Sequence, residues 1–234
     1  MNLLTLGVET SGLIGAVALR RTGQTIESVS LQQSGRRHAQ TLIAEVDEML
    51  CRAGLTSQQL DVVAVSIGPG SFTGLRVGVV FAKTLAYATG CRLAAVDTFR
   101  AIAAASPADV SEVFVVSDAQ RGDLFVGQYV LGDLARGPIR QGEIVIESAD
   151  SFGQRVRSLA AARPDIAITG PAAATLRSVL SPTVHVLASE IQHPRAEFIA
   201  ELGERQARAG ELSDPWQLEP FYLRRSAAEE KAAS

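Results

Sequence analysis

The sequence is poor in the side chains from which metal and redox sites are built. It contains two cysteines and three histidines, which are Cys51, Cys91, His38, His185 and His193. The cysteines form no Cys-x-x-Cys pair and show no metal-ligand spacing, a usage typical of a reduced intracellular compartment. The histidines form no pair at the i, i+4 spacing with which one helix presents two metal ligands. The sequence therefore predicts no metal centre.

Long apolar runs and a leader pattern are also missing. The opening MNLLTLGVETSG has no basic segment followed by a long apolar one, as a secretory signal would. No stretch reaches the roughly 18 apolar residues that a membrane helix needs. We therefore expect a cytoplasmic protein that does not bind a membrane.

The charge balance and the glycine spacing argue against three further classes of protein. A formal net charge of −3 and a pI near 5.7 argue against a protein that grips nucleic acid by itself, because phosphate contacts draw on clustered lysine and arginine. The P-loop pattern Gly-x-x-x-x-Gly-Lys-[Ser/Thr] is absent. The gap between Gly70 and Gly74 is also one residue too long for the dinucleotide-binding fingerprint.

What the sequence does contain is one strongly patterned stretch, residues 62–90. Its first part, VVAVSI, is rich in β-branched residues and predicts a buried central strand. Gly68-Pro69-Gly70 interrupts that strand, because proline lacks the N–H that a ladder needs. Ser71, or Thr73 if the turn is longer, can cap the helix that the rest of the stretch predicts.

Small residues recur at every fourth position of that predicted helix, at Gly74, Gly78, Ala82 and Ala86. Glycine inside a helix costs about 1 kcal/mol relative to alanine, so two glycines indicate a packing reason. Such a row allows another segment to approach closely. Packing alone favours an ordinary helix tucked under its own sheet, and the alternative is a docking face for a second chain.

A strand that ends in an acid, turns and runs back occurs twice, around Glu9 and around Asp118. The first turn, Glu9-Thr10-Ser11-Gly12, is expected to expose a carboxylate and two hydroxyls. Gly170-Pro171 echoes Gly68-Pro69 and predicts a second helix after a buried strand. The repetition indicates an internal duplication of a β-hairpin unit.

Strands alternate with helices in both halves, and this order is typical of the actin-like ATPase (ASKHA) architecture. We therefore expect an α/β fold with two lobes, each a mixed sheet flanked by helices, and Ser106-Pro107 is the best candidate boundary. The expected divisions are a first lobe at 1–105, a reduced second lobe at 106–190, a C-terminal helix and segment at 191–223 that packs back on the first lobe, and a polar tail at 224–234.

Four blocks carry a resemblance to a known family. They are LGVETSG, IGPGSFTGLRVGVVFAKTLA, DAQRGDLF and PFYLRR, and together they span nearly the whole chain. The chain resembles the TsaB (YeaZ) family, the dimerisation subunits of the bacterial machinery for threonylcarbamoyladenosine modification of tRNA. The resemblance implies the actin-like fold, a shortened second lobe and no catalysis by this chain.

The resemblance also implies partners. A TsaD-like catalytic subunit transfers the threonylcarbamoyl group to the adenosine next to the anticodon of ANN-decoding tRNAs, and this chain would bind and activate it. A TsaE-like ATPase is the second partner, and the chain alone is expected to form a homodimer. ATP and Mg²⁺ are then used by the complex, with none bound tightly here, and tRNA is met only through the complex.

A comparison with the TsaD-like catalytic subunits bears on whether this chain has a catalytic metal site. Where TsaD-like proteins carry a His-x-x-x-His pair, this sequence reads VDTFRAI, with Thr98 and Ile102 at the two positions. Neither side chain binds a metal as imidazole does. We therefore expect no catalytic residue and no metal ligand, and at most weak phosphate binding at Glu9, Thr10, Ser11 and Gly12.

The predicted partner interface is the helix after the glycine turn, assisted by a helix expected at residues 34–52. Its members share one side of the helix or its rim: Gly74, Leu75, Arg76, Gly78, Val79, Ala82, Lys83 and Ala86. Two alternatives of other classes remain. One is a small-molecule phosphotransferase or residual ATPase that uses Glu9 or Asp118 as a metal-site acid. The other is a metallopeptidase, against which the missing histidine pair argues.

Overall fold

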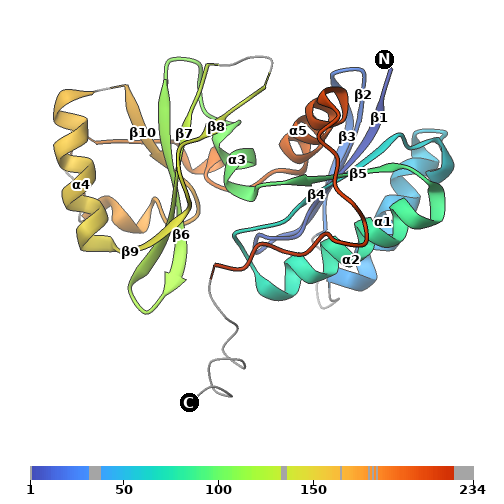
Figure 1. Ribbon diagram of the computed structural model, residues 1–234, viewed down its shortest axis with the longest axis horizontal. Helices are drawn as coiled ribbons and strands as arrows, with labels where there is room; N and C mark the ends of the chain where they lie inside the picture. Colours follow the sequence, from blue (N-terminus) through green and yellow to red (C-terminus); the bar gives the residue numbers. More distant parts are fainter. Residues whose placement is uncertain are drawn as a thin grey trace. The chain divides into compact units, whose positions relative to one another are not determined.

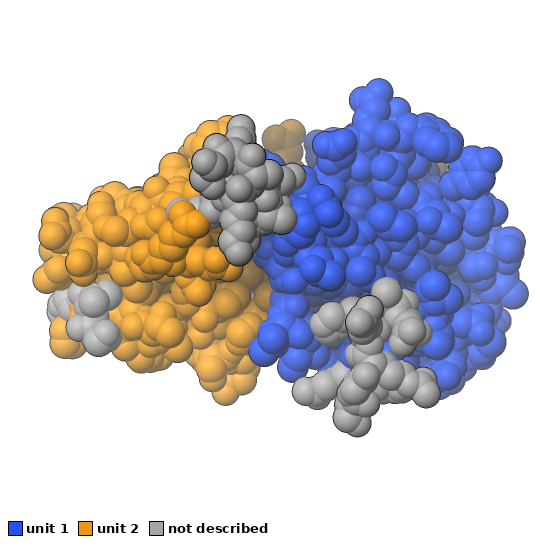
Figure 2. Space-filling model, turned by 90° about the horizontal axis from the view of Figure 1, so that it is seen from below, with its two compact units in different colours: residues 1–98, 195–222, 226–234 blue, residues 99–194, 223–225 orange. Residues whose placement is uncertain are grey.

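The computed structural model describes residues 2–31, 38–132, 136–163, 165–178, 180, 182 and 184–223, without the side chains of residues 38–40 and 178. The chain divides into two units (Figures 1 and 2). Unit 1 contains the residues up to Thr98 together with Arg195–Tyr222, and unit 2 runs from Phe99 to Pro194. The chain therefore returns to unit 1 after it completes unit 2. The predicted polar tail at 224–234 lies outside the described residues.

Unit 1 is built on a five-stranded mixed sheet with the strand order β3-β2-β1-β4-β5. The strands span Leu4–Glu9 (β1), Ala16–Arg21 (β2), Gln24–Ser30 (β3), Val62–Ser66 (β4) and Arg92–Val96 (β5). β1 pairs with β2 in the antiparallel sense and with β4 in parallel, and β4 pairs with β5 in parallel. All residues of β1 and β4 are buried, as their continuous apolar runs predict.

Helices cover both faces of this sheet (Figure 1). The helices α1 (His38–Arg52) and α2 (Phe72–Thr89) lie on one face, and α5 (Ala196–Ala209) lies on the other. Leu6, Val8 and Val65 pack into the core on the side of α1 and α2. The other face is lined by small residues, since a Cβ added to Gly203 of α5 would overlap Ala64. That lack of bulk lets α5 lie directly on the sheet.

Unit 2 contains a second mixed sheet, with the order β11-β10-β6-β7-β8 and with β9 also paired to β7. The strands span Glu112–Gln120 (β6), Asp123–Val130 (β7), Ile139–Arg140 (β8), Val145–Ser148 (β9), Ile166–Thr169 (β10) and His185–Val186 (β11). The short helix α3 (Thr98–Ala103) leads into this unit, and α4 (Ala149–Ala162) packs on the sheet through Phe152.

The two sheets repeat one topology. In unit 2, β6 pairs with β7 in the antiparallel sense and with β10 in parallel, and β10 pairs with β11 in parallel. β1, β2, β4 and β5 have the same relations in unit 1. The predicted internal duplication and the two mixed sheets are therefore confirmed.

The prediction of a helix opened by Gly170-Pro171 is wrong. Turns follow Thr169, and then a four-residue 3₁₀ helix at Thr175–Ser178. Two further single-turn 3₁₀ helices lie at Ser57–Gln59 and Ser189–Ile191. The segment after Gly170 is bounded by Pro171 and Pro182, which donate no backbone hydrogen bond, and this leaves little room for a regular helix.

No helix within the described part of the chain has both the length and the apolar character needed to cross a bilayer.

Candidate functional site

The patterned stretch folds as its local chemistry predicts. β4 ends at Ser66, and the chain turns through Gly68-Pro69-Gly70, where the Gly68–Pro69 peptide is cis. Ser71 caps α2, because its hydroxyl accepts a hydrogen bond from the N–H of Gly74 at 3.2 Å. The helix ends at Thr89, followed by Gly90 with a φ of 74°. Local sequence therefore determines where this helix begins and ends.

The small-residue row of α2 receives the first hairpin turn of the same chain. A Cβ on Gly74 would overlap the carbonyl oxygen of Thr10, and a Cβ on Gly78 would overlap Thr10 Oγ1. Thr10 Oγ1 also donates a hydrogen bond of 2.8 Å to the carbonyl of Gly74. The two glycines are thus required because the turn lies directly against the helix.

This packing corrects which side of α2 is available to a partner. Six of the eight predicted interface residues are buried inside unit 1: Gly74, Leu75, Gly78, Val79, Ala82 and Ala86. The internal interpretation of the small row is therefore right for this structure. The predicted interface was assigned to the side of this row, and an association role for the opposite, exposed side of α2 is a separate proposal.

The two predicted rim residues hold the C-terminal segment. Arg76 Nε donates to the hydroxyl of Tyr222 at 3.0 Å, and its guanidinium lies 3.9 Å from the centre of the Phe72 ring. Lys83 Nζ donates to the carbonyl of Leu218 at 3.0 Å. The segment before Leu223 is therefore fastened along α2 by an aromatic group and a backbone carbonyl.

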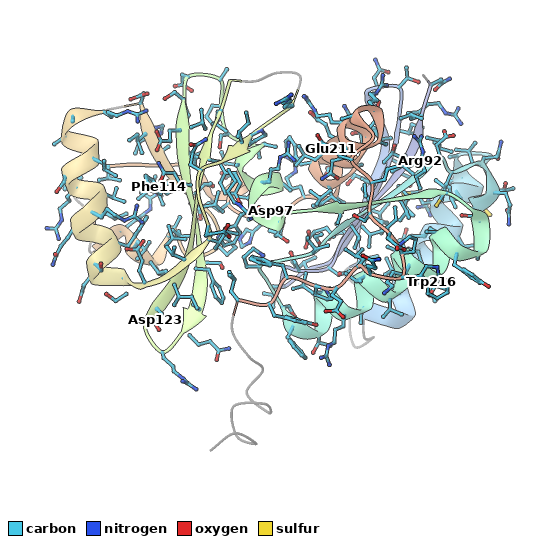
Figure 3. All side chains as sticks on the ribbon, viewed as in Figure 1. Arg92, Asp97, Phe114, Asp123, Glu211 and Trp216 are labelled. Atoms are coloured by element: carbon cyan, nitrogen blue, oxygen red, sulfur yellow. The ribbon has the colours of Figure 1, made fainter. Side chains whose placement is uncertain are left out.

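The exposed side of α2 carries large apolar groups. Val80 and Tyr87 are 62% and 75% exposed, and Trp216 of the C-terminal segment is 77% exposed. The rings of Tyr87 and Trp216 meet edge to face with 5.6 Å between their centres, and Figure 3 labels Trp216. Ile43 of α1 is 64% exposed. Sequence reasoning missed Val80, Tyr87 and Trp216, although Val80 and Tyr87 are seven residues apart on α2, a spacing that places them on one side of a helix.

The hairpin turn between β1 and β2 differs from its prediction, because its polar side chains are buried. Glu9, Thr10 and Ser11 are 0%, 1% and 5% exposed. Glu9 Oε1 accepts hydrogen bonds from the N–H of Ser11 at 2.5 Å and from the N–H of Gly12 at 3.1 Å. Burial raises the pKa of Glu9, and the nearby hydroxyls of Ser11 and Ser66 and the backbone of the turn oppose that rise. A carboxylate in this setting does not face a solvent-borne metal or substrate.

Comparisons with known proteins identify the family. The family model described as TsaD, tRNA N6-adenosine threonylcarbamoyltransferase, matches residues 26–232. The tRNA threonylcarbamoyladenosine biosynthesis protein TsaB of Haemophilus influenzae is 28% identical over 229 residues, which cover 95% of this chain and 94% of that protein. TsaB of Bacillus subtilis is also 28% identical, over 97% of this chain and 96% of its own length. The chain belongs to the TsaB/YeaZ family.

Solved structures agree with this assignment. YeaZ from Pseudomonas aeruginosa superposes with a TM-score of 0.78 at 26% identity, covering 94% of this chain and all of the other. The ROK hexokinase from Thermus thermophilus superposes with a TM-score of 0.52 at 14% identity over 88% of this chain, a likeness that concerns the fold alone. The predicted actin-like fold is thereby confirmed for this TsaB/YeaZ chain.

The positions compared with the catalytic sibling have structural roles. Thr98 is 2% exposed and its hydroxyl accepts a hydrogen bond from the N–H of Gly68 at 3.1 Å, while Ile102 is 1% exposed. Thr98 therefore braces the glycine turn that precedes α2. Within the described residues, no group of three or more His, Cys, Asp and Glu side chains gathers in one place. The side chain of His38 lies outside the described residues.

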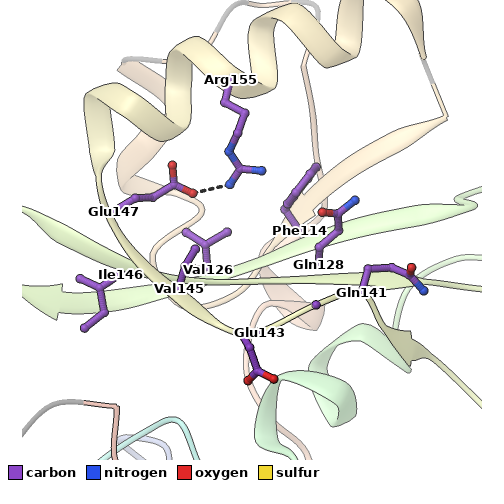
Figure 4. A pocket seen from close by; sticks show the side chains of 10 residues that line it. Phe114, Val126, Gln128, Gln141, Glu143, Val145, Ile146, Glu147 and Arg155 are labelled. Atoms are coloured by element: carbon purple, nitrogen blue, oxygen red, sulfur yellow. Dashed lines mark hydrogen bonds and ion pairs between the residues drawn. The ribbon is translucent and has the colours of Figure 1, made fainter.

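Unit 2 contains a pocket of about 400 Å³ that the sequence did not predict. Arg155 reaches over it from α4 and forms an ion pair with Glu147 of β9, and its guanidinium lies 5.1 Å from the centre of the Phe114 ring (Figure 4). The lining mixes apolar, amide and charged groups: Phe114, Val126, Gln128, Gln141, Gly142, Glu143, Val145, Ile146, Glu147 and Arg155. Its residues come from segments distant in the sequence, so no local motif marks it.

Proposed function

We propose that this chain takes part in threonylcarbamoyladenosine modification of tRNA as a non-catalytic subunit that binds and activates a TsaD-like catalytic subunit. The family assignment and the names of the TsaB relatives support the pathway. The buried state of Glu9, the first of the two acids considered for a phosphotransferase, supports the non-catalytic role. In this proposal the catalytic site belongs to the partner.

The observation that carries the association role is the exposed apolar surface of unit 1. We define the helix surface as Ile43, Val80, Tyr87 and Trp216, which all leave more than half of their area open to solvent. Large aromatic groups held in place by neighbours are the usual anchors of protein interfaces. Asp47 and Glu48 of α1, the helix that carries Ile43, are exposed and would supply acidic groups for a polar rim.

The occupant is a chain of the same family. The catalytic TsaD-like subunit would cover the helix surface in the complex, and a second copy of this chain would cover it in a homodimer. A TsaE-like ATPase would join the complex, ATP and Mg²⁺ would be used there, and tRNA would be bound through the assembled complex in the cytoplasm.

The association role can be tested by substitutions that place a negative charge on the helix surface. Val80→Glu and Tyr87→Glu should each weaken association with the TsaD-like subunit of the same organism at least about tenfold, or 1.4 kcal/mol, because a carboxylate would be desolvated in the interface. The measurements are a quantitative pull-down, light scattering of the chain alone, and modification of tRNA by the reconstituted complex.

Ile26→Glu is the matched control, since Ile26 is 46% exposed but belongs to β3 and not to α1, α2 or the C-terminal segment. It should associate and support modification like the parent. If both helix variants stay folded and associate as tightly as the parent, the interface lies elsewhere on the chain.

A further inference from the structure

The first hairpin turn contains two consecutive backbone N–H groups aimed at one oxygen. The N–H groups of Ser11 and Gly12 both donate to Glu9 Oε1, at 2.5 and 3.1 Å, and the hydroxyl of Ser11 donates to the same oxygen. Successive N–H groups that converge in this way form a nest, the arrangement with which backbones bind anions such as phosphate. In this chain the group that the nest binds is the carboxylate of Glu9, a side chain of the turn itself.

Other polar groups in and beside the turn also form hydrogen bonds within the chain. The N–H of Thr10 donates to Ser66 Oγ at 3.4 Å, and the carbonyl of Ser11 accepts from the N–H of Ser71 at 2.8 Å. The N–H of Gly74 is used by the Ser71 cap. These bonds tie the turn to the end of β4 and to the first turn of α2, so the nest is held in one shape.

The carboxylate that fills the nest is unusual in one respect. Glu9 is fully buried, and within the described residues its second oxygen, Oε2, is buried and has no hydrogen-bond partner, although the hydroxyl of Ser66 lies close enough to Glu9 to oppose the rise of its pKa. A buried acceptor without a donor costs free energy. The favourable contacts of this carboxylate are those of its other oxygen, Oε1, which brings the N–H groups of Ser11 and Gly12 together.

We propose that the nest of Ser11 and Gly12 is an oxyanion site that Glu9 occupies from within the chain, so that this turn holds no nucleotide phosphate in the native protein. Small carboxylates and phosphate are the ligands whose oxygens match the vacated position once the side chain is removed. This goes beyond the association role, which requires neither an open nor a closed nest.

Three variants of the full chain separate occupancy from charge. Glu9→Ala empties the nest. Glu9→Gln keeps an acceptor oxygen in it without the charge. Glu211→Ala removes one carboxylate from an exposed position of unit 1 and serves as the matched control. The probes are sodium formate, inorganic phosphate and Mg-ATP at constant pH and ionic strength, and the readout is the amide NMR signals of Ser11 and Gly12.

We expect saturable shifts of the two amides in Glu9→Ala with formate and with phosphate at millimolar concentration. The parent, Glu9→Gln and Glu211→Ala should show no saturable shift with any of the three probes. A saturable shift by phosphate or Mg-ATP in the parent would overturn the proposal, since the nest would then be open. A shift in Glu9→Gln as strong as in Glu9→Ala would also overturn it, since charge and not occupancy would be the barrier.

A second measurement covers the case in which Glu9→Ala is poorly folded. Formate should raise its melting temperature in a saturable manner relative to chloride at equal ionic strength, because the anion replaces the missing side chain and binds the native state only. The parent and Glu211→Ala should respond equally to the two salts. If formate stabilises Glu9→Ala no more than it stabilises the parent, the nest is not an oxyanion site. The outcome is independent of association, which the variants of the helix surface report.

Discussion

The turns of the two duplicated hairpins place their acids in opposite environments. Glu9 at the β1–β2 turn is fully buried and accepts hydrogen bonds from Ser11 and Gly12, whereas Asp118 at the β6–β7 turn is exposed and accepts one from the N–H of Gln120 at 2.6 Å. Both acids lie near the turn end of an antiparallel strand pair, although Glu9 pairs in regular register with Ala16 whereas a register shift follows Asp118. Strand topology alone therefore does not decide whether an acid at such a turn is available for chemistry.

The element that follows the neighbouring parallel strand explains part of the difference. In unit 1 that strand, β4, leads into the 18-residue helix α2, whose glycine row receives Thr10. In unit 2 the corresponding strand, β10, leads into turns and a four-residue 3₁₀ helix. The small-residue side of a long helix gives the first turn a surface against which it is buried. Among the described residues of unit 2, no such helix follows β10. The duplicated hairpins have thus diverged through their surroundings.

The largest expected effect is on the contact that buries the first turn. Gly78→Leu should lower the free energy of unfolding by at least about 2 kcal/mol, because the added side chain overlaps Thr10 Oγ1 and the turn cannot move without breaking its bonds to α2. Urea unfolding followed by circular dichroism measures it. Ala88→Leu, at an exposed position of the same helix, should unfold like the parent. Equal stability of Gly78→Leu and the parent would show that the turn is not held there.

A smaller effect is expected from the titration of Glu9. Its pKa in the folded chain is raised above the ordinary value of 4.5, mainly by burial, so the folded state binds the proton more tightly than the unfolded state does. The stability that this group contributes is therefore full below pH 4.5 and is lost as the pH rises through the folded pKa.

Glu9→Gln cannot titrate and removes that loss. The difference in free energy of unfolding, parent minus Glu9→Gln, should therefore fall as the pH rises from about 4.5 to 7, as urea unfolding at several pH values would record. A difference that stays constant over this range would mean that the buried carboxyl does not titrate differently in the two states.

The smallest effect is expected at the second turn. Asp118→Asn should change the free energy of unfolding by no more than about 0.5 kcal/mol, because the side chain is exposed and asparagine can still accept the hydrogen bond from Gln120. The same urea titrations measure it at pH 7. A loss as large as that of Gly78→Leu would mean that the two turns are not in the contrasting environments described here.

Patterns within a few residues were enough to predict the strand, turn and helix of residues 62–90 and the fold class of the chain. The β-branched run of β4, the Ser71 cap and the end of α2 at Gly90 follow from backbone chemistry that is local to each position. The repeated strand–acid–turn order predicted the duplication, and four short blocks identified the family. These features depend on the spacing of residue types and on local backbone preferences, and both can be read from residues that are close in the sequence.

Only the tertiary structure decided what fills the space beside the glycine row. Thr10 lies 64 positions from Gly74, and Tyr222 lies 146 positions from Arg76, yet each pair is joined by a hydrogen bond. A small residue in a sequence indicates that something comes close, but the neighbour is set by strand order and by the return of the chain to unit 1. For that reason the row indicated a close approach but was assigned to a partner chain, while the position of Thr10 against it, the buried state of Glu9 and the exposed helix surface with Trp216 emerged only from the folded chain.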